Sequence, residues 1–226
     1  MQVVILAAGN GKRMGALTKS VPKPMLKIKG KPLLEHKINA LPKEITEVII
    51  VAGYRGEQIM NYFKRFFNNR KITYFFQRNL NGTGGALHLV RSVLGDRFFV
   101  MMGDDLYHKR DIKKLMKHNH AILGYPNDHS GLFGALKTNN RNYLVEVVEK
   151  PKRSTDKFIN TGLYILDEKF FDYDLVQLKD GEFGLPQTVA VMAKDFPVKV
   201  EKATLWHPIG TPEDLEKAEN IIHKFF

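Results

Sequence analysis

Short apolar runs alternate, throughout the first half of the chain, with stretches whose apolar residues recur three or four positions apart. The apolar runs predict buried strands at residues 3–7, 48–52, 72–76 and 98–102. The helical spacing predicts helices over residues 33–41, 59–67 and 86–94. Helices between successive buried strands are typical of a parallel sheet that is covered by helices on both faces.

The pattern changes in the second half of the chain. Residues 133–138 and 143–148 flank a polar turn and predict an antiparallel hairpin. The remaining apolar runs predict strands at residues 158–166 and 198–205, and a helix over residues 185–193. This half is therefore expected to mix strands and helices without the regular alternation of the first half.

The clearest helix start lies near the end of the chain. Thr211 is a suitable N-cap, Pro212 suits the first turn, and Asp214 follows three residues after the cap. Apolar residues then recur at helical spacing as far as Phe225. Together these elements predict one α/β domain over residues 1–226, with a Rossmann-like, mostly parallel mixed sheet flanked by helices and an antiparallel hairpin insertion.

The composition agrees with one folded domain and excludes several classes of protein. Of the 226 residues, 43% are hydrophobic and 26% are charged, which is ordinary for a globular protein. No apolar run approaches the roughly 18 to 20 residues of a membrane helix, and the N-terminus lacks a signal-peptide pattern. The absence of cysteine excludes disulfides and cysteine nucleophiles. We expect a cytoplasmic protein with no membrane partner.

The formal net charge of +11 predicts an attraction for anions, which include nucleic acid, membrane phosphates and small phosphorylated molecules. Many of the lysines are dispersed, as Lys27, Lys113 and Lys117 illustrate, and dispersed lysines are typical of a solvated surface. The charge alone does not choose among these anions. We therefore predict no nucleic-acid partner from it.

A glycine-rich, cationic segment at residues 6–15 follows the first predicted strand directly. Glycines let backbone amides approach an anion, and Lys12 and Arg13 add positive charge, so the segment predicts a phosphate-binding loop. A Rossmann fingerprint would place glycine at Met14, and a Walker A loop would place Ser or Thr at Arg13, so neither motif fits. A glycine turn without a ligand is the alternative for this segment alone.

Lys23 lies between two prolines, which restrict the backbone around a lysine that would contact one phosphate repeatedly. Residues 6–26 as a whole resemble the signature of the sugar-nucleotide pyrophosphorylases, L-A-A-G-x-G-x-R-M-x-x-L-T-x-x-x-P-K-P-M-L. The resemblance implies a sugar-1-phosphate nucleotidyltransferase, similar to the glucose-1-phosphate thymidylyltransferases and uridylyltransferases. Such an enzyme joins an NTP to a sugar-1-phosphate and releases pyrophosphate. The predicted hairpin would then lie on the sugar side.

The resemblance also implies a role for particular residues. The residues implied for catalysis are Arg13 and Lys23. Those implied for nucleotide binding are Leu6, Ala7, Ala8, Gly9, Gly11, Lys12, Gln77, Gly82 and Thr83. Those implied for the sugar phosphate are Gly134, Glu149, Lys150, Asn160, Thr161 and Glu182. Asp104, after the strand at residues 98–102, is implied as the Mg²⁺ ligand, so Mg²⁺ is the expected cofactor.

The base and the sugar are less tightly specified. Gln77 matches a glutamine that contacts a pyrimidine ring in the family, but family members that use ATP can carry glutamine there too. A glutamine amide offers both a donor and an acceptor, and it does not by itself discriminate uracil from thymine. UTP or dTTP, with glucose-1-phosphate, are the favoured substrates, and the chain is compatible with a homo-oligomer.

One segment departs from the family pattern. Residues 206–212 resemble W-x-D-I-G-T-P, but Pro208 replaces the aspartate that commonly supplies the second Mg²⁺ ligand. His207 is adjacent, although imidazole is a poor ligand for Mg²⁺. Either Asp104, phosphates and water hold the metal, or the protein is a catalytically weak regulator that binds nucleotide or sugar.

A second alternative is a cytidylyltransferase that acts on a non-sugar phosphate such as phosphocholine. An aromatic cage built from residues such as Tyr125, Phe133 and Tyr164 would favour it. The chain ends shortly after the last predicted helix, so we expect it to lack the β-helix acetyltransferase domain that some relatives carry.

Overall fold

The apolar runs of the first half form the centre of one sheet. The computed structural model describes residues 1–126, 131–151 and 156–226. Its central parallel strands are β1 (Gln2–Ala7), β4 (Glu47–Ala52), β6 (Arg70–Phe76) and β7 (Arg97–Met102), in the order β7-β1-β4-β6. Val3 and Val4 are buried in different hydrophobic clusters on the two faces of this sheet. Because both faces are covered, the whole run is apolar rather than alternating.

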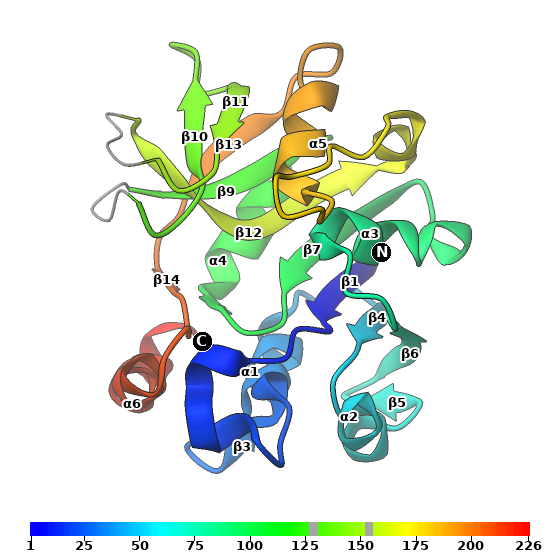
Figure 1. Ribbon diagram of the computed structural model, residues 1–226, viewed down its shortest axis with the longest axis vertical. Helices are drawn as coiled ribbons and strands as arrows, with labels where there is room; N and C mark the ends of the chain where they lie inside the picture. The colour runs from blue at the N-terminus through cyan, green and yellow to red at the C-terminus, as the bar shows by residue number, and fades with distance from the viewer. Residues whose placement is uncertain (127–130, 152–155) are drawn as a thin grey trace.

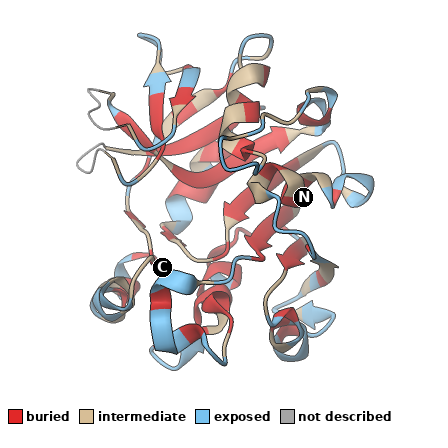
Figure 2. Cartoon of the chain, viewed as in Figure 1, coloured by how far each residue is buried: buried red, intermediate tan, exposed pale blue. Residues whose placement is uncertain are grey.

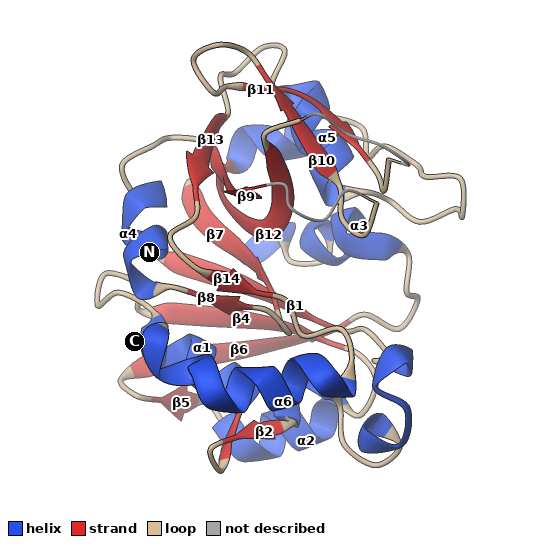
Figure 3. Cartoon of the chain, turned by 90° about the vertical axis from the view of Figure 1, so that its left-hand side faces the viewer, coloured by secondary structure: helices blue, strands red, loops and turns tan. Residues whose placement is uncertain are grey.

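Helices cover both faces of the sheet (Figures 1 and 3). One face packs against α1 (Leu33–Ala40), α2 (Gly56–Phe63) and α4 (Lys109–Leu115), and the other against α3 (Gly82–His88) and α5 (Leu185–Met192). Their apolar residues are buried against the strands, as Figure 2 shows by colour. The predicted α/β fold, with a mixed, mostly parallel sheet flanked by helices, is confirmed.

Antiparallel strands extend the sheet beyond β7. The long strand β12 (Phe158–Asp167) pairs with β7, with β9 (Ala121–Pro126) and with β10 (Ala135–Thr138). Strand β11 (Leu144–Val148) completes a hairpin with β10, and β13 (Lys199–Lys202) pairs in parallel with β9. The predicted hairpin is therefore confirmed, and it forms one edge of the sheet.

The remaining elements are short, apart from helix α6. They are β2 (Lys27–Ile28), β3 (Lys31–Pro32), β5 (Phe66–Phe67), β8 (Leu106–Tyr107), β14 (Trp206–His207), α6 (Pro212–Ile221) and 3₁₀ helices at Lys12–Thr18, Lys23–Met25, Arg91–Val93, Glu168–Asp172 and Ile222–Lys224. Helix α6 lies beside the N-terminal 3₁₀ helix (Figure 1), and Met14 and Ala218 belong to the hydrophobic cluster that joins them. No helix in the described ranges is long and apolar enough to span a bilayer.

Two predicted helices are wrong in extent. Helix α2 ends at Phe63 and Phe67 lies in β5, because Lys64 adopts φ 53° and turns the chain. The helix predicted over residues 86–94 begins at Gly82 and ends at His88. Apolar spacing missed the glycine-rich first turn, where the N–H of Gly84 donates to the carbonyl of Phe183 (2.8 Å).

The late part of the sheet also differs from its prediction. The strand predicted over residues 198–205 extends only over β13, whose four residues pair with residues 121–124 of β9. Strand β9 and helix α4 were not predicted. The apolar run of β9 contains Gly124, and α4 has few apolar residues among its lysines, so neither pattern is distinctive.

Candidate active site

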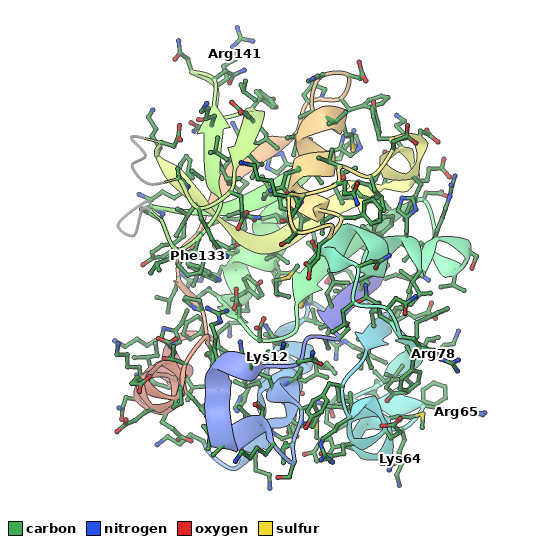
Figure 4. All side chains as sticks on the ribbon, in the orientation of Figure 1. Lys12, Lys64, Arg65, Arg78, Phe133 and Arg141 are labelled. Atoms are coloured by element: carbon green, nitrogen blue, oxygen red, sulfur yellow. The ribbon has the colours of Figure 1, made fainter. Side chains whose placement is uncertain are left out.

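The glycine-rich loop after β1 forms one wall of a cavity of about 490 Å³. Lys12, from this loop, lies near the middle of the molecule (Figure 4). The predicted site residues that line the cavity are Leu6, Ala7, Ala8, Gly9, Gly11, Lys12, Arg13, Lys23, Gln77, Gly82, Thr83, Asp104 and Glu182. The structure therefore brings together the predicted nucleotide-binding residues, both predicted catalytic residues and the predicted metal ligand.

Lys23 and Asp104 form an ion pair in this cavity. Lys23 Nζ lies 2.5 Å from Asp104 Oδ2, and Lys23 is only 7% exposed. Pro22 is extended and Pro24 occupies the first turn of a 3₁₀ helix, so the backbone on both sides of Lys23 is restricted. Asp104 follows β7, at the strand end where ligands of open α/β sheets bind. An incoming phosphate would compete with Asp104 for the ammonium.

Arg13 lies against the segment that precedes α6. A Cβ atom on Gly210 would lie 3.1 Å from Nη1 of Arg13, so the guanidinium lies close to the backbone of Gly210. Asp214 Oδ2 accepts hydrogen bonds from the backbone N–H groups of Gly210 and Thr211, both at 2.9 Å, and holds this segment in place. The C-terminal segment therefore positions a cation beside the phosphate loop.

Gln77 lies just after β6 and is buried. Its Nε2 donates to Oδ1 of Asn81 (2.8 Å) and to the carbonyl of Gly82 (3.1 Å). Its neighbours along the cavity wall, Leu80, Gly82 and Thr83, carry no formal charge. Glu182 lines the cavity beside Gly82. The uncharged neighbours of Gln77 contrast with the cationic Lys12, Arg13 and Lys23, so the cavity suits a ligand with an anionic end and an uncharged end.

The predicted sugar-phosphate residues form a separate group. A Cβ on Gly134 would lie 3.2 Å from Oε2 of Glu149 and 3.9 Å from Cβ of Asn160, so these residues are neighbours. They and the exposed Lys150 do not line the main cavity, whereas Glu182 does. Thr161 is 1% exposed, and its hydroxyl donates to the carbonyl of Leu123 (2.8 Å). Its side chain is therefore committed to the sheet interior and does not face a ligand.

The donor set for a metal is a single carboxylate. Asp104 lines the cavity, but Asp105 accepts a hydrogen bond from Nε1 of Trp206 (3.1 Å). His207 Nε2 contacts the carbonyl of Asp214 (2.8 Å), and Pro208 has no side-chain donor atom. In the described part of the chain, no group of three or more His, Cys, Asp or Glu side chains could hold a metal. One carboxylate with phosphates and water still fits Mg²⁺, which commonly keeps several waters.

A buried lysine near this carboxylate was missed. Lys37 of α1 is 4% exposed, and its Nζ has no hydrogen-bond partner but lies 4.6 Å from the ring centre of Tyr107. Burial lowers the pKa of Lys37 to about 8, although Asp105 and Asp104 oppose the shift. Burial, with the charge of Asp104, raises the pKa of Asp105 to about 7. Lys37 lies four residues after Leu33, on the helix face that periodicity predicts to be buried, so that spacing was the available signal.

Comparison with known proteins agrees with this arrangement. Residues 2–224 match the sequence profile described as nucleotidyl transferase. The chain belongs to this family. The resemblance of residues 6–26 to sugar-nucleotide pyrophosphorylases is thereby confirmed at the level of the family.

Similar proteins in archaea fall in the same nucleotidyl transferase family. The chain is 33% identical to the bifunctional protein GlmU of Methanococcus aeolicus, over 99% of this chain and 55% of that protein. It spans about half the length of the GlmU relatives it matches. It is 29% identical to the UTP–glucose-1-phosphate uridylyltransferase AglF of Haloferax volcanii, over 99% of this chain and 97% of that protein.

The fold is also found in solved structures of other proteins. A Bacillus anthracis protein assigned as a glucose-1-phosphate thymidylyltransferase, solved in complex with sucrose, matches with a TM-score of 0.87 and 25% identity. The match covers 98% of this chain and 94% of that protein. HddC from Yersinia pseudotuberculosis matches with a TM-score of 0.76 and 26% identity, over 98% of this chain and 99% of HddC.

Proposed function

We propose that this nucleotidyl transferase joins UTP or dTTP to glucose-1-phosphate, forming an NDP-sugar and pyrophosphate. The observation that carries the proposal is the single cavity lined both by the charged Arg13, Lys23 and Asp104 and by Gln77 with its uncharged neighbours Leu80 and Thr83. A nucleoside triphosphate has the same division into a charged end and an uncharged base. The similarity to a UTP–glucose-1-phosphate uridylyltransferase supports uridine and glucose as the first substrates to test.

The reaction needs no covalent protein intermediate. An oxygen of the sugar phosphate attacks the α-phosphorus of the NTP in line, forming a P–O bond while the bond to the pyrophosphate oxygen breaks. A phosphate monoester dianion is already nucleophilic, so the protein has to align two anions and offset their charge. Arg13 would contact the departing pyrophosphate. Lys23 would move from Asp104 to the α-phosphate, and Lys150 would hold the sugar phosphate beside Glu149.

Mg²⁺ is the proposed cofactor, with Asp104 as its ligand from this chain. The ion would neutralise charge on the triphosphate oxygens. When Lys23 leaves Asp104 to contact the phosphate, the Asp104 carboxylate would become available to bind Mg²⁺. Pro208 removes a second carboxylate from the usual family pattern, so we expect the substrate phosphates to supply more of the ligands.

The phosphocholine alternative rests on an aromatic cage. Tyr125 and Phe133 do lie together, with ring centres 5.6 and 5.0 Å from that of Trp206. The rings pack on one another, and none of the three lines the main cavity. Tyr164 is buried and accepts a hydrogen bond from Asn160, apart from them. These three residues therefore do not form an aromatic cage that lines the cavity.

The test is pyrophosphate release with Mg²⁺ present, crossing UTP, dTTP, CTP, ATP and GTP against four sugar-1-phosphates (glucose, N-acetylglucosamine, galactose and mannose) and phosphocholine. Release with UTP or dTTP and glucose-1-phosphate supports the proposal. Release only with CTP and phosphocholine would replace it by the alternative. Nucleotide binding without any release would favour the regulator that Pro208 suggests.

A further inference from the structure

Asn81 contacts Gln77 in a way that fixes which end of the glutamine amide can meet a ligand. Gln77 Nε2 lies 3.1 Å from the backbone carbonyl of Gly82. A carbonyl oxygen can only accept, so the atom of Gln77 that faces it must be nitrogen. Nε2 also lies 2.8 Å from Asn81, which must therefore present its oxygen. The carbonyl of Gly82 thus identifies which end of each amide is nitrogen, and the shorter of the two contacts that hold Gln77 in this orientation is the one to Asn81.

This arrangement uses both hydrogens of the Gln77 amide nitrogen. No described residue donates to Oε1 of Gln77, and Gln77 lines the cavity, so Oε1 is the atom left for a ligand. Leu80 and Thr83, which line the cavity with Gln77, carry no formal charge. The nucleobase of a bound NTP would therefore meet an acceptor rather than a donor.

We propose that Asn81 is a positioning residue that holds Gln77 with Oε1 toward the nucleobase, so that the cavity selects a base whose ring nitrogen carries a proton. This inference rests on the proposed function, because it assumes that an NTP occupies the cavity. The N3–H of uracil or thymine donates to Oε1. Cytosine presents the lone pair of an unprotonated N3, which repels Oε1 and leaves both acceptors unpaired. We call this contact of Asn81 with Gln77 the lock. It favours the binding of UTP and dTTP over that of CTP.

Neighbouring contacts keep Asn81 in place. The backbone N–H of Phe183 donates to the carbonyl of Asn81, and the carbonyl of Phe183 accepts from Gly84, both at 2.8 Å. The amide of Asn81 lies over Gly85, where a Cβ atom would overlap it. Asn81 itself is exposed, so replacing it should not disturb the core. Gly85 is helical, so alanine there suits α3 while displacing the end of the Asn81 side chain.

The lock is tested by calorimetric titration of UTP, dTTP and CTP, each with Mg²⁺, into the wild-type protein and four variants. The wild type should bind UTP and dTTP about tenfold or more tightly than CTP. Asn81→Ala and Gly85→Ala remove or displace the acceptor and should bring the ratio to about threefold or less. Asn81→Asp keeps an acceptor and should preserve the ratio. The control is Asn79→Ala, at an exposed neighbour whose side chain bonds to no described residue.

Each outcome is decisive for the lock. Equal affinity for UTP and CTP in the wild type overturns it, as does an unchanged ratio in both Asn81→Ala and Gly85→Ala. Failure to bind any of these nucleotides overturns it as well. Because binding is measured without a sugar phosphate, the two proposals fail separately. Selective binding of UTP without pyrophosphate release would support the lock and contradict the proposed enzymatic activity. Equal turnover of UTP and CTP would support the enzymatic activity and contradict the lock.

Discussion

Lys37 is a buried lysine close to the site, and its burial affects the stability of the protein. Its ammonium is buried without a hydrogen bond, and a buried charge is costly unless neighbouring groups compensate. The partial compensation here comes from the face of Tyr107 and from the charges of Asp104 and Asp105. Lys37 lines a small cavity together with Met101, Leu106 and Ile112, so its surroundings are largely apolar.

The first prediction concerns stability against pH. The pKa of Lys37 falls from 10.5 to about 8 on folding, so between these pH values the unfolded chain holds a proton that the folded chain releases. The free energy of unfolding should therefore rise with pH in this window, by up to about 1.4 kcal/mol per pH unit from this group. Urea unfolding from pH 7 to 10.5 should show a shallower rise for Lys37→Met than for wild type.

Lys113→Met is the matched control, because Lys113 is an exposed lysine on α4. Its variant should follow the wild-type pH dependence. Parallel curves for wild type and Lys37→Met would mean that Lys37 does not lose its proton in this range.

The second prediction concerns Arg13, which is exposed and whose guanidinium lies close to Gly210. Arg13→Ala removes a cation from the place proposed for pyrophosphate, so turnover should fall by about a hundredfold or more. Its melting temperature should stay near the wild-type value, because no core packing is lost. Arg141→Ala removes an exposed arginine at the far end of the molecule (Figure 4) and should be as active as wild type. Equal activity of Arg13→Ala would refute the role of Arg13.

At the scale of elements, the helices differ from the apolar pattern mainly at their ends. The N-terminus of α6 is as predicted, because the capping box of Thr211 and Asp214 is local and both bonds are present. The C-terminus of α2 is not, because apolar spacing continues past Phe63 to Phe67 while the backbone turns at Lys64. That turn lets β5 pair with β6.

The third prediction tests this turn. Lys64 has φ 53° and ψ −148°, a conformation that glycine adopts more easily than lysine. Lys64→Gly should therefore raise the free energy of unfolding by up to about 1 kcal/mol, measured by urea denaturation. Lys64 is exposed, so little packing is lost (Figure 4). Asn61→Gly, inside the same helix, should lower stability instead, and a loss of stability in both variants would contradict the strain.

At the scale of the whole molecule, the protein has a net charge of +11, and its cavity is lined by Lys12, Arg13 and Lys23. Such a field attracts phosphorylated ligands over a distance, and dissolved salt screens it. The expectation of a homo-oligomer also belongs to this scale and stays a prediction, which light scattering would test. Cytoplasmic location likewise stays a prediction.

The fourth prediction follows from the charge. Raising NaCl from about 0.05 to about 0.5 M shortens the screening distance severalfold, so the Kd for UTP should rise several-fold in calorimetric titrations. Thermal unfolding at each salt concentration is the control, since it shows whether the protein itself changes. If the Kd for UTP does not change with salt, long-range electrostatic attraction does not contribute to the affinity and the prediction is wrong.

The sequence by itself determined the features that depend on neighbours along the chain. Strand cores such as residues 3–7, the capping box of α6 and the phosphate loop with Arg13 follow from local composition and spacing. It also predicted that Lys23, Gln77 and Asp104 share a site, because their motifs resemble those of a family whose fold brings them together.

Only the tertiary structure decided the relations between distant segments. The Lys23–Asp104 ion pair, the contact of Arg13 with Gly210 and the burial of Lys37 join residues far apart in the chain. Strand β13 pairs with β9, and the interior position of Thr161 depends on Leu123 of another strand. Such features arise when elements pack, since pairing and burial depend on which surfaces meet and a periodic pattern specifies only which face of each element is apolar.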